Sequence, residues 1–514
     1  MSFLAGGKRW VTALGHWRIS KQGEIQMKNL YTLLKERAGS EEYPFHMPGH
    51  KRRVEMFGDP YRIDITEIEG FDDLHHAKSI LKEAEGRAAE TFHADETHYL
   101  INGSTTGLLS ALLGCTERGD RILIARNCHK SVYNAVFLND LHPVYIYPEY
   151  VPGTDMNGEI SAEQVELILA EYPDIRAAVL TSPTYDGVVS DVRKIAEAVH
   201  KKNIPLILDE AHGAHLGFHP YFPENGNQLG ADIVVHSLHK TLPSLTQTAL
   251  LHMNGSIVKR DKVRRYLHML QSSSPSYVLM AGMDECIRML NDRGEKVFAE
   301  YTILLDDARR RLQGLRHMKL MRTERYDPSK IVISVKDTVL PDSGNTFTGR
   351  ELYRCLAENY HLQAEMAAGF YVVLMTSPAD TREGIERLLT ALFEIDRKLD
   401  LQKRNKKDFT DISESTAEED MPFLEKNTVS YETVYNAYDA EQKRAEGSKP
   451  VRWAEAKGRI SLEYTYLYPP GIPLIVPGER ISDQTVTQIE RYEEMGFDIE
   501  GTEHTGMIEV LANE

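Results

Sequence analysis

The feature that most constrains the fold is an alternation of short apolar runs with amphipathic segments between residues 102 and 252. Apolar runs of this length, rich in Val, Ile and Leu, are typical of strands in a sheet that is covered on both faces. Strands that alternate with helical segments pair in parallel through crossover connections, so the sequence predicts an α/β fold with a mainly parallel sheet. The candidate strands are 121–125, 143–147, 177–181, 205–208, 232–236 and 248–253.

Two predicted helices have recognisable N-termini. Ser161 and Gln164 precede an apolar face at helical spacing and have the pattern of a capping box, in which side chains bond the free backbone donors of the first turn. We expect Asp380 and Glu383 to play the same part before a later helix. The apolar face of that later helix is formed by Ile385, Leu388, Leu389 and Leu392.

A chain of 514 residues is too long for one ordinary core, so two or three domains are expected. After about residue 284 the pattern becomes helix, strand, helix, strand, helix, which indicates a smaller α+β domain. A polar, charge-rich stretch then separates it from a tail that regains apolar and aromatic residues. The predicted division is an N-terminal extension and helix (1–42), a large domain (43–290), a small α+β domain (291–401), a linker (402–428) and a small C-terminal domain (429–514).

Composition excludes several classes of protein. No uninterrupted apolar run reaches the length of about 18 residues that a membrane span needs, and residues 1–26 lack the apolar core of a secretory signal. The formal net charge of −17 argues against nucleic acid as the main partner. Four cysteines without CxxC spacing suggest reduced thiols in the cytoplasm, with neither a disulfide framework nor a metal site.

The segment VVHSLHKT, residues 234–241, presents Ser237, His239 and Lys240 where a predicted strand ends. Open α/β sheets bind their ligands at this edge. An amine that captures an aldehyde must be neutral, so burial or a nearby cation has to lower its pKa. An isolated His–Lys pair is more often a solvated loop, and the neighbouring motifs therefore decide the interpretation.

The segment LILDEAHGAH, residues 206–215, places Asp209 after another apolar strand. A carboxylate at that position can hold the nitrogen of a pyridine ring protonated, which makes the ring an electron sink. Lys240 follows 31 residues later, one strand–helix–strand unit away, so the two side chains can flank one ring. A helix cap or turn is the alternative role for Asp209.

Two further segments complete the pattern. NGSTTG, residues 102–107, offers hydroxyls and free backbone amides at a helix start, which suits a phosphate, although it also suits a plain helix cap. In RNCHKS, residues 126–131, His129 can stack on an aromatic ring or donate a proton. A Cys128–His129 nucleophile is disfavoured because adjacent side chains usually diverge and no third group orients them. No GxGxxG follows a strand, which disfavours an NAD-dependent Rossmann enzyme.

These segments, in this order, resemble the Orn/Lys/Arg decarboxylase family of fold-type-I pyridoxal-phosphate enzymes. The resemblance spans about residues 43–481. It includes FHMPGHK (45–51), DITEIEGFDDL (64–74), SSSPSY (272–277) and YPPGIPLIVPGERI (468–481). It implies a seven-stranded sheet in the large domain, pyridoxal 5'-phosphate as cofactor, a homodimer or higher homo-oligomer, and decarboxylation of arginine, lysine or ornithine in polyamine biosynthesis.

The resemblance also implies roles for individual residues. Lys240 carries the cofactor as a Schiff base, Asp209 pairs with the ring nitrogen, His129 stacks on the ring and His212 lies beside it. Phosphate binding falls to Thr105, Thr106, Ser237 and His239, with Ser104 as a weaker addition and Ser272 as a position that can reach a neighbouring subunit's phosphate. Glu365, which precedes an apolar strand, is a candidate partner for the cationic end of the substrate, although an exposed strand-end glutamate is an equal alternative.

Two departures from the family pattern are visible. The chain lacks the N-terminal wing domain of the large acid-induced decarboxylases, and Pro243 replaces the usual small residue after the SxHK lysine. Short forms of the family resemble polyamine-pathway enzymes, which slightly favours arginine as substrate. The alternatives are another fold-type-I enzyme, either an aminotransferase or an aldolase-type lyase, and a catalytically silent regulatory protein with the same fold.

Overall fold

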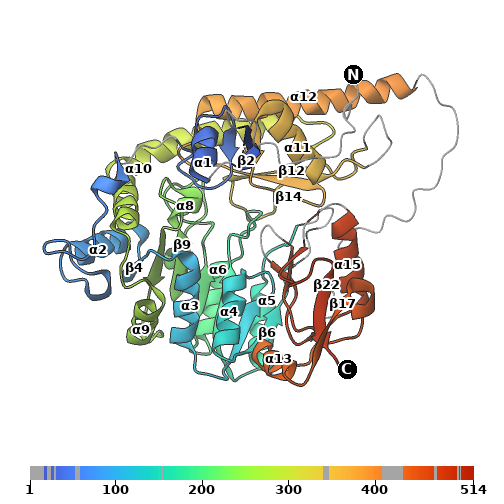
Figure 1. Cartoon of the computed structure of the whole chain (residues 1–514). Coiled ribbons are helices and arrows are strands. Elements are labelled where there is room, and N and C mark those ends of the chain that lie inside the picture. Colours follow the sequence, from blue (N-terminus) through green and yellow to red (C-terminus); the bar gives the residue numbers. More distant parts are fainter. Residues whose placement is uncertain are drawn as a thin grey trace.

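A seven-stranded sheet lies at the centre of the computed structural model (Figure 1), with strand order β4-β10-β9-β8-β7-β5-β6. The structure describes residues 17–19, 25–27, 30–52, 58–149, 151, 154, 156–339, 346–407, 432–467, 472–494, 497 and 499–513. The strands of this sheet are β4 (Glu96–Leu100), β5 (Arg121–Ala125), β6 (His142–Ile146), β7 (Ile175–Thr181), β8 (Leu206–Asp209), β9 (Ile233–Ser237) and β10 (Ala249–Met253).

The pairing of the sheet confirms the predicted α/β class. Strands β9, β8, β7, β5 and β6 are parallel neighbours, while β10 runs antiparallel to both β9 and β4. All six predicted strands are present, shifted by at most two residues at an end. The remaining strand, β4, has the sequence ETHYL, whose mixed polarity gives it no continuous apolar run.

Helices cover both faces of this sheet and bury a core of Val, Ile, Leu and Ala side chains. Ser161 begins one of them as predicted, because its hydroxyl accepts a hydrogen bond from the Gln164 N–H, but the structure shows no return bond from the Gln164 side chain. The helices of this region are α2 (Ile80–Phe92), α3 (Gly103–Cys115), α4 (Lys130–Leu138), α5 (Ala162–Glu171), α6 (Val192–His200), α7 (Gly226–Leu229), α8 (Leu238–Thr241) and α9 (Arg260–Leu270).

A four-stranded antiparallel sheet with three long helices forms a second layer above the large sheet (Figure 1). Its strands are β11 (Lys319–Leu320), β12 (Lys330–Ser334), β14 (Met366–Ala368) and β15 (Tyr371–Met375), and its helices are α10 (Tyr277–Leu312), α11 (Gly349–Tyr360) and α12 (Arg382–Lys407). Helix α10 is continuous across the predicted domain division at 290/291. A short parallel pair, β3 (Tyr43–Phe45) with β13 (Leu362–Ala364), ties the N-terminal segment to this layer.

The predicted cap of the last of these helices is wrong by one residue. Thr381 caps α12, because its hydroxyl accepts from the Gly384 N–H and its carbonyl from the Ile385 N–H. Asp380 instead accepts hydrogen bonds from the Tyr43 hydroxyl and the Ser377 N–H. These partners are distant or backward in the chain, so the local pattern at the helix start does not reveal them.

The C-terminal segment packs beside α4 and the edge strand β6 (Figure 1). The Phe137 ring contacts Tyr438, and the Asn436 amide donates to Asp140 at the end of α4. Its elements are β16 (Glu432–Thr433), α13 (Ala437–Arg444), β17 (Ser448–Arg452), α14 (Trp453–Ala456), β18 (Thr465–Leu467), β19 (Ile472–Ile475), β20 (Glu479–Arg480), α15 (Asp483–Glu494), β21 (Ile499–Glu500) and β22 (Met507–Leu511). They bury a small core of their own.

The N-terminal extension and the linker fall largely outside the described residues. A hairpin of β1 (Trp17–Ile19) and β2 (Ile25–Met27) precedes α1 (Leu30–Ala38). Residues 402–407 of the predicted linker are the last part of α12, which corrects that prediction, and residues 408–428 lie outside the described part. No helix within the described ranges is long and apolar enough to cross a membrane.

Candidate active site

The carboxyl ends of β5, β8 and β9 bring together residues that are far apart in sequence. These strands are parallel members of one sheet, so the loops that follow them leave from the same edge. Asp209 is the last residue of β8, Lys240 lies in α8 directly after β9, and His129 lies four residues beyond the end of β5. The ammonium of Lys240 acts to lower the pKa of both the Asp209 carboxyl group and the His129 ring.

Among the residues that the structure describes, the Lys240 amine has one hydrogen-bonded partner, His212. Its Nζ lies 3.1 Å from His212 Nε2. Burial lowers the pKa of Lys240, and the carboxylates of Asp209 and Glu365 act in the opposite direction. Burial and the same ammonium also hold the pKa of His212 well below its ordinary value, so a neutral imidazole can accept a hydrogen bond from the lysine amine. This arrangement suits an amine that has to react in its neutral form.

Asp209 is buried at the carboxyl end of β8. Burial raises the pKa of its carboxyl group, whereas Lys240 and the Ala211 N–H, whose hydrogen bond to Asp209 Oδ1 is 3.2 Å long, act to lower it. A buried carboxylate of this kind is stabilised when a cation lies against it. A protonated ring nitrogen would provide that cation.

His129 is the N-cap of α4. Its Nδ1 accepts the Ser131 N–H over 3.2 Å and lies 2.9 Å from the Ser131 hydroxyl, which fixes the ring as the tautomer with hydrogen on Nε2. Burial and the Lys240 ammonium lower the pKa of His129 to about 4, so the ring is neutral at physiological pH. A neutral, oriented imidazole at this edge can lie against an aromatic ring without adding charge.

The first turn of α3 offers free backbone donors. Asn102 is the N-cap but makes no capping bond, because its side-chain oxygen accepts the Ser272 N–H over 3.1 Å. The first backbone donors of the turn that holds Ser104 and Thr105 are therefore left for a ligand, whereas the Thr106 hydroxyl donates to the Asn102 carbonyl over 3.3 Å. Gly107 lets this turn lie against the sheet, since a Cβ there would come within 2.6 Å of the Leu100 side chain.

Two residues of the SxHK segment face the same region. The Ser237 hydroxyl is fully buried and has no hydrogen-bond partner among the residues that the structure describes. His239 Nδ1 lies 3.0 Å from the Thr248 carbonyl, and burial lowers its pKa to about 4. Gly49 of the FHMPGHK segment packs on this turn, because its N–H donates to the His239 carbonyl over 2.7 Å.

Ser272 lies at the surface, next to the α3 turn through its bond to Asn102. Its hydroxyl donates to the Ser274 carbonyl, and its own carbonyl is 2.8 Å from His75 Nε2. The structure therefore brings Ser272 to the rim of the predicted phosphate site, with its side chain engaged locally.

Glu365 belongs to the other layer, between β13 and β14, and its carboxylate acts to raise the pKa of Lys240. One carboxylate oxygen accepts the Met47 N–H over 2.9 Å, and the other accepts the Tyr185 hydroxyl. Both oxygens thus already join three parts of the chain: the N-terminal segment, the loop after β7 and the small sheet. Both carboxylate oxygens of Glu365, the residue predicted to pair with a substrate cation, are thus engaged inside the protein.

Two buried lysines, Lys51 and Lys330, were not predicted from the sequence to be functional. Lys51 ends the FHMPGHK segment, and its Nζ donates to the carbonyls of His46 and Met375 and lies 3.8 Å from Asp380. Lys330 begins the buried strand β12, and its Nζ has no hydrogen-bond partner in the described part of the chain. A lysine at the head of the apolar run KIVIS is the only signal in the sequence for this second position.

A buried ion pair joins the C-terminal segment to the loop that carries His129. Arg126 Nη2 lies 3.1 Å from Glu479 Oε2, and the two side chains are only 6% and 2% exposed. Burial raises the pKa of Glu479, and the Arg126 guanidinium opposes that change. Nothing in the sequence marks the two residues as partners, because they are more than 350 positions apart.

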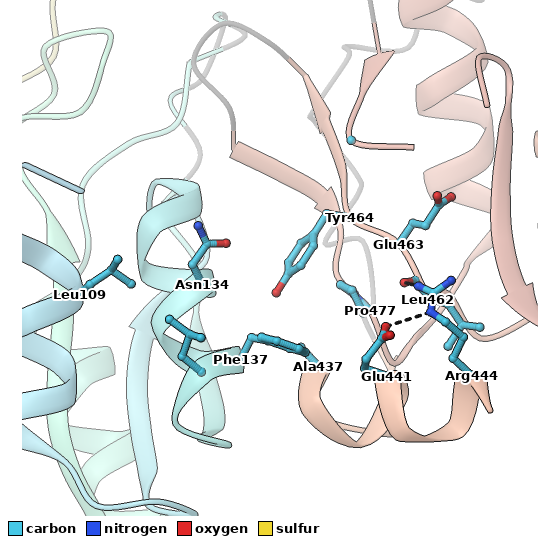
Figure 2. Close-up of a pocket in the computed structure, with 12 residues that line it drawn as sticks. Leu109, Asn134, Phe137, Ala437, Glu441, Arg444, Leu462, Glu463, Tyr464 and Pro477 are labelled. Carbon is cyan, nitrogen blue, oxygen red and sulfur yellow. Dashed lines mark hydrogen bonds and ion pairs between the residues drawn. The ribbon is translucent and has the colours of Figure 1, made fainter. Parts of the chain in front are cut away.

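A cavity of about 470 Å³ lies between α4 and the C-terminal segment (Figure 2). Phe137 and Asn134 line it from α4, and Tyr464 points into it from the opposite side. Glu441, one of its acidic residues, is paired with Arg444. None of the predicted cofactor residues lines this cavity, so it is distinct from the site at the sheet edge.

Comparison with known proteins gives a consistent result. The family model described as "Orn/Lys/Arg decarboxylase, major domain" matches residues 28–343, and the model of the C-terminal domain of the same family matches residues 423–500. An arginine decarboxylase of Bacillus subtilis is 32% identical over 92% of this chain and 95% of its own length. An arginine decarboxylase of Halalkalibacterium halodurans is 31% identical over 89% and 92%.

Solved structures agree on the fold. A lysine decarboxylase of Francisella novicida superimposes with a TM-score of 0.73 at 20% sequence identity, covering 93% of this chain and 80% of that one. At this identity the likeness concerns the fold alone.

Proposed function

The chain belongs to the Orn/Lys/Arg decarboxylase family, and we propose that it removes the α-carboxylate of arginine as CO2 and releases the corresponding amine. It is a pyridoxal-phosphate-dependent decarboxylase of a basic amino acid. The observation that carries the choice of arginine is that the two relatives described above, at 32% and 31% identity, are arginine decarboxylases matched over nearly their whole length. An amine made from a basic amino acid suits polyamine formation, which we propose as the role of the product.

We infer that the residues at the sheet edge hold the cofactor. The buried Ser237 hydroxyl without a partner and the uncapped first turn of α3 fit the phosphate, together with Thr105, Thr106 and His239. Asp209 fits the ring nitrogen, and His129 fits one face of the ring. Lys240 fits the aldehyde because its amine is buried and directed at His212.

Bound pyridoxal phosphate supplies an electron sink for the electron pair that the leaving carboxylate gives up. Asp209 keeps a proton on the ring nitrogen by Coulomb attraction, which strengthens that sink. Lys240 Nζ would hold the proton that the substrate Cα needs after CO2 has left, and the neutral His212 ring, 3.1 Å away, would orient this group by accepting its hydrogen bond. Burial of the site excludes water from these steps.

A turnover assay with arginine, lysine and ornithine tests the proposal. We expect arginine to give CO2 and its amine with a kcat/KM about 10-fold or more above the other two, because specific recognition of the side-chain end discriminates at least this well. Identification of the amine by mass spectrometry checks the product. Preference for lysine or ornithine would contradict the choice of arginine, and CO2 release from none of the three would contradict decarboxylation itself.

We also propose that the enzyme works as a homodimer. Large apolar side chains are exposed around Ser272 and the phosphate turn, which is unusual for a surface that faces only water. The segment 58–80, which carries five of the six, packs on the end of α9, where the rings of His75 and His268 meet, and α9 itself carries the sixth. They are Tyr61, Ile63, Ile68, Phe71, Ile80 and Met269.

Replacement of Phe71 by aspartate tests the proposed dimer. A charge in an apolar interface costs several kcal/mol, so the variant should be monomeric and should lose most of its activity. Leu167→Asp is the matched control, because Leu167 is an exposed apolar residue on α5, far from this surface. Light scattering should give a dimer for the wild type and for the control. A monomeric, fully active wild type would contradict the proposal.

The four cysteines are all free thiols in the structure. Free thiols, some of them partly exposed, persist in a reducing compartment. We therefore propose a cytoplasmic location.

A further inference from the structure

The loop that carries His129, residues 126–129, is closed around the side chain of Arg126. This arginine is the first residue after β5 and lies three residues before His129. Its carbonyl accepts the Tyr133 hydroxyl over 2.6 Å, and the same hydroxyl accepts the guanidinium Nη1 over 3.0 Å. Its N–H donates to the Ile146 carbonyl of β6 over 2.8 Å. Arg126 and Tyr133 therefore hold the chain on both sides of His129.

The guanidinium of Arg126 is enclosed by aromatic rings and by the C-terminal segment. It lies over the Tyr145 ring, 5.2 Å from the centroid, and it donates to Glu479 Oε2 over 3.1 Å. Both members of this ion pair are buried. A buried guanidinium needs a paired carboxylate, because an uncompensated charge inside a protein is strongly destabilising. Glu479 supplies that charge from a segment that has a core of its own.

Glu479 is itself held by a tight turn. Its carboxylate accepts the Val476 N–H over 2.9 Å, and its own N–H donates to the Val476 carbonyl over 3.1 Å. Gly478 has a φ of +89°, and a Cβ there would clash with the Tyr435 carbonyl, so this turn requires glycine. The carboxylate thus reaches Arg126 from a fixed backbone.

Other contacts already dock the C-terminal segment on the large domain. The Phe137 and Tyr438 rings lie 6.0 Å apart, and the Asn436 amide donates to Asp140 over 3.1 Å, both at the end of α4 that is distant from His129. Docking alone does not require a buried ion pair, which often stabilises a protein no more than apolar packing of the same volume. The place of this pair, at the start of the His129 loop, indicates a role in the geometry of that loop.

We propose that Glu479 is a positioning residue: through its ion pair with Arg126 it holds the His129 loop where His129 meets the cofactor ring. The inference rests on the proposed function, in which His129 lies against one face of that ring. Glu479 contacts neither substrate nor cofactor in this assignment. Its influence on the reaction therefore passes through His129, and the site is complete only when the C-terminal segment is docked.

Two variants of Glu479 test this role. Glu479→Ala should lower kcat about 10- to 100-fold, the effect of misplacing a catalytic group by about 1 Å. Glu479→Asp keeps the charge, and hence the fold, but its carboxylate reaches one methylene less far, so kcat should fall about 3- to 10-fold. KM for arginine should stay within about twofold in both, because no substrate contact is removed. Glu432→Ala is the matched control, because it removes an exposed ion pair with Arg480 on the neighbouring strand and should match the wild type.

Amide hydrogen exchange of the cofactor-free protein gives a readout that does not depend on turnover. In the wild type, the Ser131 N–H is bonded to His129 Nδ1 and the Val132 N–H to the His129 carbonyl. These amides should exchange about 10-fold or more faster in both Glu479 variants, while the amides of β8 keep their wild-type rates. Wild-type exchange of the Ser131 and Val132 amides, or a wild-type kcat in Glu479→Asp, would overturn the inference.

Combination with His129→Ala shows by which route Glu479 acts. In a His129→Ala background, either Glu479 variant should change kcat by no more than about twofold, because the group that Glu479 positions is already absent. A further loss as large as the one in the wild-type background would mean that Glu479 acts elsewhere, and the inference would fail. A wild type that releases no CO2 from arginine, lysine or ornithine would instead overturn the proposed function, and the exchange rates would still decide whether Glu479 holds the loop.

Discussion

Replacement of Lys240 by alanine should lower kcat by about 10⁴-fold or more and abolish the covalent lysine–cofactor bond. The reason is local: Lys240 Nζ has His212 as its hydrogen-bonded neighbour, and burial lowers its pKa so that a neutral amine is accessible. No other described lysine combines this position with a neutral acceptor. Turnover assays check the rate, and the long-wavelength absorbance of the purified protein checks the bond.

The control for this variant is Lys202→Ala, which removes an exposed lysine from the turn after α6 and should leave both readouts unchanged. Lys240→Ala should still bind pyridoxal phosphate non-covalently, because the phosphate and ring contacts are separate from the amine. An alanine variant that keeps more than a few per cent of wild-type turnover would assign the covalent role to another residue, with Lys51 and Lys330 as the first to test.

The large sheet was predictable because its strands are buried on both faces. A strand such as β8, with the sequence LILD, carries its apolar residues without interruption, and the polar residue that ends it marks the ligand-binding edge. That is why Asp209 and Lys240 could be singled out together. Strand β4 was not predicted. It lies at the edge of the sheet, where it pairs with β10 alone, and its sequence ETHYL mixes polar with apolar residues.

The second layer of the site was not predictable in the same way. Lys330 and Glu365 come from the small sheet, and Lys51 comes from the N-terminal segment, so only the packing of three parts of the chain brings them together. The cap of α12 failed for a related reason, because Asp380 bonds Tyr43, which lies 337 residues away. Local patterns describe elements, whereas contacts between distant elements depend on the whole fold.

Replacement of Asp209 by asparagine should keep the cofactor bound but lower kcat by about 10²- to 10³-fold. Asparagine has the same shape and can still accept the Ala211 N–H, so the fold and the ring position are preserved. A neutral amide does not hold a proton on the ring nitrogen, and the electron sink is weakened. Steady-state assays with saturating pyridoxal phosphate check the rate, and Asp191→Asn, at the N-cap of α6, is a control for an aspartate outside the site.

The same variant has a signature in the pH dependence of stability. Burial raises the pKa of Asp209 in the folded, cofactor-free protein above the value of 3.8 in the unfolded chain. The folded state then holds the proton more tightly, so the free energy of unfolding falls as the pH rises from about 4 through the folded-state pKa. Asp209→Asn removes this decline, and its stability relative to the wild type should grow over that pH range. Bound cofactor should abolish the difference, because the ring cation pairs with the carboxylate. A wild-type rate in Asp209→Asn would mean that this carboxylate is not the partner of the ring nitrogen. Equal pH profiles of stability for the variant and the wild type without cofactor would mean that burial does not raise its pKa.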